Sequence, residues 1–401
     1  MPIITRKKNG NSSLHPNPKI IQPSYRNLIL VCFFCLVVNS GGFAQNLPLF
    51  NNPELLEMVD RGGDYIYNQE FSFAEKVIDS LERKLPEHPI VPMMRAMSWA
   101  WRDQPIRMSS PVYSQHEKYL METIAKSEKI SAKDSNNLEA MFFEMSAHGL
   151  LAEYYAQEGS SFKAISQAKQ TYNLIKRTME HTAKSPELLF LSGLYNYFRE
   201  KYPERHPMYK SFVWIFKSGD IKRGLIQLDS AVHHSKIVKI EAGLYLSYIW
   251  LRYENRADKA RYYLERLHKM YPANDYFKAK YLECLMRQKD YSNALPLIQS
   301  LEKHQKPYFK MCGEIFHGVY LEKVDHSLAH AKLLYEKGLA TGAKSPDRGE
   351  YYRSIAYLGL GRLAESNGDM GLAAEYYEKT IDLDETDWMT AEGEARLEKI
   401  D

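Results

Sequence analysis

Cysteine is scarce in this sequence, and its placement limits the chemistry that the chain can carry. Four cysteines occur among 401 residues, and Cys32 and Cys35 lie in an apolar stretch near the N-terminus. Cys284 and Cys312 remain for the rest of the chain, and a zinc site needs more ligands than this pair offers. Both lie in expected helices among apolar neighbours. We therefore expect two small buried side chains, although an exported protein would permit a disulfide between them.

A strong excess of charge of one sign is also missing. Lys and Arg number 53 against 50 Asp and Glu, but residues 1–44 hold five basic residues and no acidic one. The remainder therefore carries 48 basic residues against 50 acidic ones. Nucleic-acid binding depends on clustered Lys and Arg side chains. We expect no nucleic-acid partner.

No apolar run in the sequence is long enough to cross a bilayer comfortably. The longest near the N-terminus, 28–38, has eleven uncharged residues, whereas a spanning helix needs about 20. It follows a basic stretch and precedes Gly42 and Ala44, which fit the small-residue rule of signal peptidase. We expect 1–44 to be a signal peptide cleaved before Gln45, with 45–52 as a short linker and a location in the periplasm or cell envelope. The alternative is a retained N-terminal membrane anchor, which would be the only source of membrane contact.

Catalytic and cofactor signatures are absent as well. The sequence contains no P-loop, no glycine-rich dinucleotide fingerprint, no zinc-protease helix motif and no nucleophile elbow. His233 and His234 are adjacent, and neighbouring side chains on a helix point about 100° apart, so they are poorly placed to share a metal. We expect no enzyme activity, no cofactor and no metal.

What the sequence does contain is helical periodicity. From residue 53 onward, apolar residues recur at spacings of three and four in segments separated by short polar breaks, and alternation typical of strands is poor. Ala260 and Ala294 are 34 positions apart, and each is preceded by a polar turn and followed by an apolar residue four positions later. Gly62 with Ala74 and Gly361 with Ala373 fit the same frame near the two ends. A fixed period of this length indicates a repeat architecture.

This pattern resembles the tetratricopeptide repeat (TPR) family, in which a first helix carries Leu-Gly between aromatic residues and a second helix carries an alanine. Four copies match well, at 62–86, 244–272, 278–307 and 357–377, and four are degenerate. The sequence also resembles uncharacterised exported TPR proteins of Bacteroidota. The resemblance implies an all-α solenoid of about eight antiparallel helix pairs over 53–401. We expect a C-terminal capping helix near 386–400 and an insertion at about 199–217.

The solenoid implies a non-enzymatic scaffold that binds a protein or peptide of unknown identity on its concave face. Projecting the repeat frame onto the first helices and adding two polar residues of the insertion gives the candidate binding residues. These are Tyr245, Arg252, Tyr276, Glu283, Arg287, Leu358, Arg362 and Glu365 on the helices, and Arg205 and His206 in the insertion.

Two other functions stay open. One is a structural subunit of an envelope transport or secretion assembly. The other is an enzyme or small-ligand binder with its site at the insertion. The many aromatic residues also allow an aromatic-lined sugar groove, but we expect Tyr248, Tyr291 and Tyr377 to pack between helices. For the insertion, we expect Phe212, Trp214 and Phe216 to cover the next helix pair, with gating of the groove as the alternative.

Overall fold

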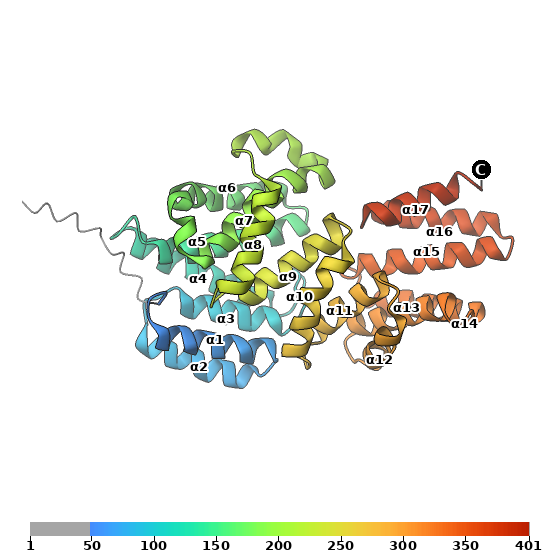
Figure 1. The fold of residues 1–401 in the computed structure, drawn as a ribbon, viewed down its shortest axis with the longest axis horizontal. Helices are drawn as coiled ribbons and strands as arrows, with labels where there is room; N and C mark the ends of the chain where they lie inside the picture. Colours follow the sequence, from blue (N-terminus) through green and yellow to red (C-terminus); the bar gives the residue numbers. More distant parts are fainter. Residues whose placement is uncertain (1–48, 401) are drawn as a thin grey trace, which may run out of the picture. The chain divides into compact units, whose positions relative to one another are not determined.

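The fold is described by a computed structural model for residues 49–400, and within that range it contains helices and no strand. The expected leader, 1–44, lies outside the described residues. Figure 1 shows the order of the elements along the chain. The seventeen α-helices of this range are α1 (Pro53–Tyr67), α2 (Phe71–Lys84), α3 (Ile90–Trp101), α4 (Tyr113–Ser131), α5 (Leu138–Gln157), α6 (Ser161–Thr178), α7 (Pro186–Arg205), α8 (Ile221–His234), α9 (Lys239–Tyr248), α10 (Ala257–Met270), α11 (Asp275–Arg287), α12 (Tyr291–Glu302), α13 (Pro307–Lys323), α14 (Leu328–Gly342), α15 (Glu350–Ser366), α16 (Met370–Leu383) and α17 (Asp387–Leu397). Three short segments are also helical: η1 (Met179–Lys184), η2 (Pro207–Ile215) and η3 (Ile249–Tyr253).

The helices pack as consecutive pairs. Each odd-numbered helix from α1 to α15 contacts the even-numbered helix that follows it, and each pair contacts the next. This arrangement makes eight pairs, and α17 packs on α15 and α16 after the last of them. The predicted all-α solenoid of helix pairs with a C-terminal capping helix is therefore confirmed.

Small residues on one helix admit large rings from its partner. A Cβ added at Gly361 on α15 would lie 2.4 Å from the ring of Tyr377 on α16. A Cβ at Gly318 on α13 would lie 2.8 Å from the ring of Tyr335 on α14. Both tyrosines are fully buried. The glycine positions of the repeat frame thus set the distance between paired helices.

The core runs along the array as layers between pairs. One cluster of buried side chains extends from Leu49 to Phe277, and a second extends from Leu251 to Met389. Trp250 and Tyr276 pack against both clusters, so the layers are continuous from one to the other. Stacking of this kind is required because a single helix pair leaves one apolar face uncovered.

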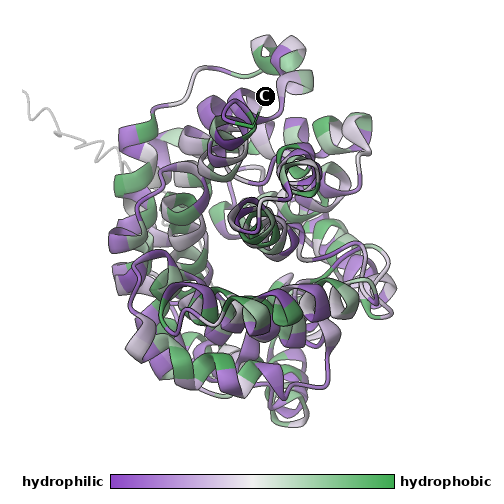
Figure 2. Ribbon diagram, turned by 90° about the vertical axis from the view of Figure 1, so that its right-hand side faces the viewer, coloured by the Kyte–Doolittle hydropathy of each residue, from purple (hydrophilic) through white to green (hydrophobic). Residues whose placement is uncertain are grey.

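The array curves until its first helix contacts its middle. The amide of Asn274, the residue that caps α11, donates 2.8 Å to the carbonyl of Tyr67 at the end of α1. Tyr271 donates 2.6 Å to Asp64, and Lys239 pairs with Asp60 at 2.5 Å. Figure 2 shows the array in a view turned by 90° from that of Figure 1.

A second set of contacts joins the loop after α3 to the loop before α15. Arg348 donates 2.9 Å to Asp103 and 2.8 Å to the hydroxyl of Ser110. In the opposite direction, Nε of Arg107 donates 3.0 Å to the carbonyl of Asp347. These residues are more than two hundred positions apart, so their contacts close the array around its inner face.

Two segments differ from the sequence-based expectation. Residues 199–205 continue α7, and only the following η2 segment departs from a regular helix pair. The end of the expected linker is also anchored, since Leu49 is fully buried and its amide donates 3.0 Å to Glu139 on α5. The reason is that Leu49 fills a gap beside the first layers of the core.

Within the described part of the chain, none of the helices has the length and apolar character needed to cross a membrane.

Candidate functional site

The curved array encloses a cavity of about 1400 Å³. Its walls come mainly from the first helices of the pairs, together with α6, η2 and the loop at 104–107. The beginning of α15 and the segment 383–387 complete the lining. Cavities that hold small ligands are typically about 300–1,000 Å³, so this one has room for more than a single small molecule.

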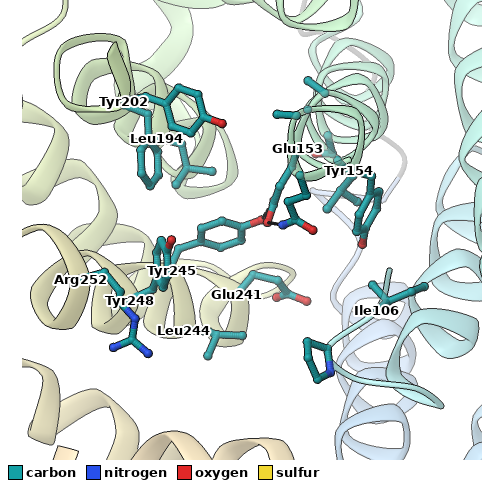
Figure 3. A pocket seen from close by; sticks show the side chains of 18 of the residues that line it. Ile106, Glu153, Tyr154, Leu194, Tyr202, Glu241, Leu244, Tyr245, Tyr248 and Arg252 are labelled. Atoms are coloured by element: carbon teal, nitrogen blue, oxygen red, sulfur yellow. Dashed lines mark hydrogen bonds between the residues drawn. The ribbon is translucent and has the colours of Figure 1, made fainter. Parts of the chain in front are cut away.

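Tyrosine dominates the inner surface. Tyr245 on α9 crosses the cavity, and its hydroxyl donates to the carboxylate of Glu153 on α5 (Figure 3). The tyrosines of the lining are Tyr67, Tyr154, Tyr172, Tyr195, Tyr202, Tyr209, Tyr245, Tyr248, Tyr253, Tyr271, Tyr276, Tyr308, Tyr351 and Tyr352. Tyr248 is 44% exposed and lines the cavity, so its predicted packing between helices is wrong, whereas Tyr377 is buried as predicted.

A widened helical turn brings Arg252 into the lining. After α9, the amide of Glu254 donates 3.0 Å to the carbonyl of Ile249, five residues earlier, which defines the π-helical turn η3. Such turns re-aim side chains and are frequent at functional sites. Tyr248, the last residue of α9, and Arg252, within the turn, both line the cavity and are visible in Figure 3.

Arg252 is held by two groups. Its guanidinium forms an ion pair with Glu283 on α11, and its Cζ lies 3.6 Å from the ring centre of Tyr351 on α15. Arg252 is 8% exposed and Glu283 is fully buried. Burial acts to raise the pKa of Glu283, but the charges of Arg252 and Lys280 hold it below its usual value. Glu283 is therefore ionised and serves as the counter-charge of Arg252.

Three other carboxyl groups of the lining behave differently. Burial raises the pKa of Glu153, although the hydrogen bond from Tyr245 opposes the shift. Burial likewise raises the pKa of Glu241 on α9, against the hydrogen bond from Tyr67. Burial also raises the pKa of Glu385, which lies between α16 and α17, although the charge of Arg252 opposes the shift. In each case removal from water outweighs the stabilisation of the charged form.

The segment predicted as an insertion also lines the cavity. Arg205, at the end of α7, pairs with Asp387 at 2.7 Å, and its Cζ lies 5.0 Å from the ring centre of Tyr253. The ring of His206 lies 4.3 Å from that of Tyr202. Tyr202, Arg205 and His206 are all part of the lining.

The aromatic residues that follow lie on the preceding helix pair, which differs from the expected cover over the next pair. Phe216 contacts Tyr172 on α6 at 5.3 Å between ring centres, and Phe212 contacts Phe162 on the same helix at 6.5 Å. Trp214 is 80% exposed. The reason is that η2 turns back across α6 before α8 begins.

Six of the ten predicted binding residues line the cavity: Tyr245, Arg252, Tyr276, Glu283, Arg205 and His206. The other four are Arg287, Leu358, Arg362 and Glu365. Leu358 is 1% exposed and belongs to the core of the last repeats. Arg362 forms a bidentate pair with Glu322 at 2.7 and 2.9 Å, so it clamps a carboxylate of its own chain.

The capping helix α17 occupies the inner face where the polar members of these four lie. The guanidinium of Arg287 stacks on Trp388, with Cζ 3.9 Å from the ring centre. Two ion pairs also join α15 to α17: Arg362–Glu392 at 3.0 Å and Arg396–Glu365 at 2.7 Å. The later part of α15, at Arg362 and Glu365, therefore packs against α17, whereas its beginning lines the cavity.

Four lining residues were not among the binding residues predicted from the repeat frame: Glu153, Glu241, Tyr248 and Glu385. Glu153 precedes Ala164 by the same eleven positions that separate Glu283 from Ala294. The repeat frame would thus have found Glu153 if it had been applied to the degenerate third pair. Glu241 and Glu385 carry no such signal, because their exposure to the cavity depends on long-range closure.

Metal-binding and thiol chemistry have little support in the described residues. No group of three or more His, Cys, Asp or Glu side chains in 49–400 is placed to hold a metal ion. Cys284 and Cys312 are free and fully buried, as predicted. Burial raises the pKa of each thiol to about 12, so both are un-ionised at neutral pH.

No protein-family model and no curated protein sequence matches this chain. Three similar solved structures are one of yeast Tom70 and two of the human IFIT1 dimer. The crystal structure of yeast Tom70 aligns with a TM-score of 0.37 and 10% identity over 87% of this chain and 75% of that one. The human IFIT1 dimer with PPP-AAAA aligns with a TM-score of 0.33 and 15% identity, over 85% of this chain and 97% of the other. The same dimer with m7Gppp-AAAA aligns with a TM-score of 0.31, at the same identity and coverage. Scores this low transfer no function, and the resemblance to Bacteroidota proteins gains no support from these comparisons.

Proposed function

We propose that this protein is a non-enzymatic binding scaffold of the cell envelope, which receives an extended peptide segment of a protein partner in its central cavity. The observation that carries the proposal is the tyrosine-lined cavity of about 1400 Å³ enclosed by the first helices. Stacked helix pairs use concave faces of this kind to bind extended peptides or partner helices. Tyrosine suits such a surface because its rigid ring supplies apolar area and its hydroxyl supplies a hydrogen bond.

The state of the chain's thiols supports a binding role over catalysis. A thiolate is the reactive form of cysteine, and neither Cys284 nor Cys312 reaches it near neutral pH, because burial raises each pKa to about 12. The buried cation of the lining, Arg252, is already engaged by Glu283. These groups hold the cavity wall in place.

The envelope location rests on the leader at 1–44, with its basic stretch, apolar run and Gly42-Phe43-Ala44. N-terminal sequencing of the protein from an envelope fraction should find Gln45 as the first residue. An intact Met1 would favour the retained anchor instead.

Peptide binding in the cavity can be tested by filling it. Gly149 on α5 lines the cavity, and a Cβ added there meets no atom within 4 Å. Gly149→Trp should therefore fold normally and occupy space needed by a ligand. Binding to an array of random peptides should fall sharply relative to the unmodified protein.

Gly371→Trp is the matched control. Gly371 on α16 is also free of neighbours within 4 Å, but it does not line the cavity. This variant should bind the array as the unmodified protein does. Equal binding by all three proteins would place the peptide site elsewhere and overturn the proposal.

A second candidate is a structural subunit of an envelope assembly, and an apolar surface around η2 favours it. Phe162 is 83% exposed, Trp214 is 80% exposed and Met208 is 61% exposed. Exposed apolar groups that gather in one place often mark contact with another protein. Replacing Phe162 and Trp214 by Ser would abolish assembly under this candidate and leave peptide binding intact.

A further inference from the structure

The charged side chains of the cavity are mostly paired with one another. The ion pairs between lining residues are Lys239–Asp60, Arg252–Glu283, Lys280–Glu283, Lys201–Glu204, Arg205–Asp387 and Arg107–Glu350. Among the described residues, no Lys, Arg or His forms an ion pair with Glu153, Glu241 or Glu385. Glu385 does lie in the field of Arg252 and Lys280, which share Glu283. Apart from Glu385, four lining carboxyl groups remain without an ion pair among the described residues: Asp64, Asp384, Glu153 and Glu241. Asp64 accepts from Tyr271 and Asp384 accepts from Thr390.

Glu153 and Glu241 face the same part of the cavity. Glu153 accepts the hydroxyl of Tyr245 from α9, and Glu241 precedes Tyr245 by one helical turn. Figure 3 shows Glu153 and Glu241 entering the cavity from different helices, with Tyr245 between them. Two carboxylates from α5 and α9 thus flank one volume.

Each of the two carboxylates is engaged by its own chain only through hydrogen bonds from uncharged groups. Glu153 accepts from Tyr245 and, at 3.1 Å, from the amide of Gln157. One oxygen of Glu241 accepts from Tyr67, while the other, Oε2, is buried and has no hydrogen-bond partner. A buried acceptor without a donor is destabilising, and a donor from a bound molecule would satisfy it.

The surrounding rings suit a cation with an aliphatic stem. Tyr154 and Tyr245 neighbour Glu153, and Tyr67 donates to Glu241. Aromatic faces attract ammonium and guanidinium groups, and their apolar area packs against methylene chains.

The nearby cations do not already satisfy Glu153 and Glu241. Arg107 acts on Glu153 from a distance, but its guanidinium donates to the carbonyl of Asp347 and to the side chain of Gln157. Lys239 acts on Glu241 but is paired with Asp60. Neither of these two cations forms an ion pair with Glu153 or Glu241.

We infer that the cavity selects peptides by a lysine or arginine side chain, whose cationic head binds between Glu153 and Glu241 while its stem packs on the tyrosine rings. This inference rests on the proposed peptide-binding function and adds the chemistry of the bound residue. An acidic peptide would bring like charge to the same carboxylates and is selected against.

The test uses the mature chain from Gln45 on an array of random peptides sorted by composition. Bound peptides should be enriched in Lys and Arg and depleted in Asp and Glu. The basic peptide that binds most tightly is then labelled with a fluorophore, and fluorescence anisotropy measures its dissociation constant for each variant. Glu153→Gln and Glu241→Gln keep the side-chain shape but replace one acceptor oxygen by an amide donor and cannot ionise, so each should weaken binding by roughly ten- to a hundredfold.

The control is Glu378→Gln, which removes an exposed carboxylate on α16 away from the cavity and should leave binding unchanged. Circular dichroism of each variant checks that folding is retained. Spermidine serves as a free amine without a peptide backbone and should compete only weakly.

The outcomes separate the two proposals. Enrichment of uncharged or acidic peptides that Gly149→Trp no longer binds would keep peptide binding and overturn the choice of a basic side chain. Equal loss of basic and neutral peptides in Glu153→Gln would also overturn it. Spermidine binding as tight as the best peptide would assign the site to free amines instead. An array with no bound peptide would overturn both proposals.

Discussion

Arg348 and Asp103 lie 245 positions apart in the sequence, and their side chains meet at 2.9 Å in the folded protein. Burial acts to raise the pKa of Asp103, but the hydrogen bond and charge of Arg348 lower it overall. The pair joins the loop after α3 to the loop before α15. It is therefore a contact between two distant turns of the same array.

Replacing Arg348 by Ala should loosen this closure. The variant leaves Asp103 and Ser110 without their charged donor, which should cost about 1–3 kcal/mol of local stability. In a repeat array the loss should stay near the broken contact. Hydrogen exchange should show reduced protection in 102–112 and 345–350 with little change near α8.

The matched control for Arg348 is Arg256→Ala. Arg256 also pairs with an aspartate, but Asp258 is its close neighbour in the sequence and the pair is exposed. No measurable change is expected there. Similar exchange in the two variants would mean that the long-range pair does not close the array.

Two glycines should respond in opposite directions to the same substitution. Gly149 faces open space in the cavity, so Gly149→Ala should stabilise the protein by about 0.5–1 kcal/mol, because alanine loses less backbone freedom in a helix. A Cβ added at Gly361 would lie 2.4 Å from the ring of Tyr377, so Gly361→Ala should destabilise the protein by about 1–3 kcal/mol through overpacking. Urea unfolding measures the change in the free energy of unfolding for each variant. Destabilisation by Gly149→Ala would show that the space around Gly149 is filled.

His116 should make stability depend on pH. Its Nδ1–H donates 2.8 Å to the carbonyl of Ala96, and Nε2 is buried without a partner. Burial lowers the pKa of His116 to about 4, against the hydrogen bond to Ala96, from 6.5 in an unperturbed histidine. Between these values the unfolded chain binds a proton that the folded chain does not. The contribution of His116 to the free energy of unfolding is therefore fully present above pH 6.5. It is lost as the pH falls toward 4, by up to about 3 kcal/mol.

The variant His116→Gln isolates this effect because glutamine does not titrate. Its stability deficit relative to the unmodified protein should be largest near pH 7 and should shrink by about 3 kcal/mol toward pH 4. Urea unfolding at several pH values measures the difference. A deficit that stays constant with pH would mean that His116 is protonated equally in both states.

Arg205 and His206 should matter more for binding than for folding. Arg205 pairs with Asp387, whose side chain is 85% exposed, and exposed pairs contribute little to stability. The double substitution to Ala should change the free energy of unfolding by less than about 1 kcal/mol. Because both residues line the cavity, binding of the selected peptide should weaken. Unchanged peptide affinity would make the end of α7 a structural wall only.

The sequence alone determined the helix pairs, their number and the helix that caps them. Those features follow from apolar neighbours three and four positions apart and from a period of 34 positions, such as Ala260 repeating at Ala294. A helix pair packs by local shape, so a residue pattern of fixed period is enough to predict it. The inward direction of Tyr245, Arg252 and Glu283 came from the same pattern.

Only the tertiary structure decided which inward faces remain open. α17 covers the inner face at Arg362 and Glu365, while η2 turns back across α6, and neither path is encoded in the repeat period. Closure of the array depends on small rotations summed over many pairs and on contacts such as Arg348–Asp103. A residue pattern within one repeat does not predict the total rotation of the array. The cavity, and the placement of Glu153 and Glu241 in its lining, therefore arise only when distant repeats meet.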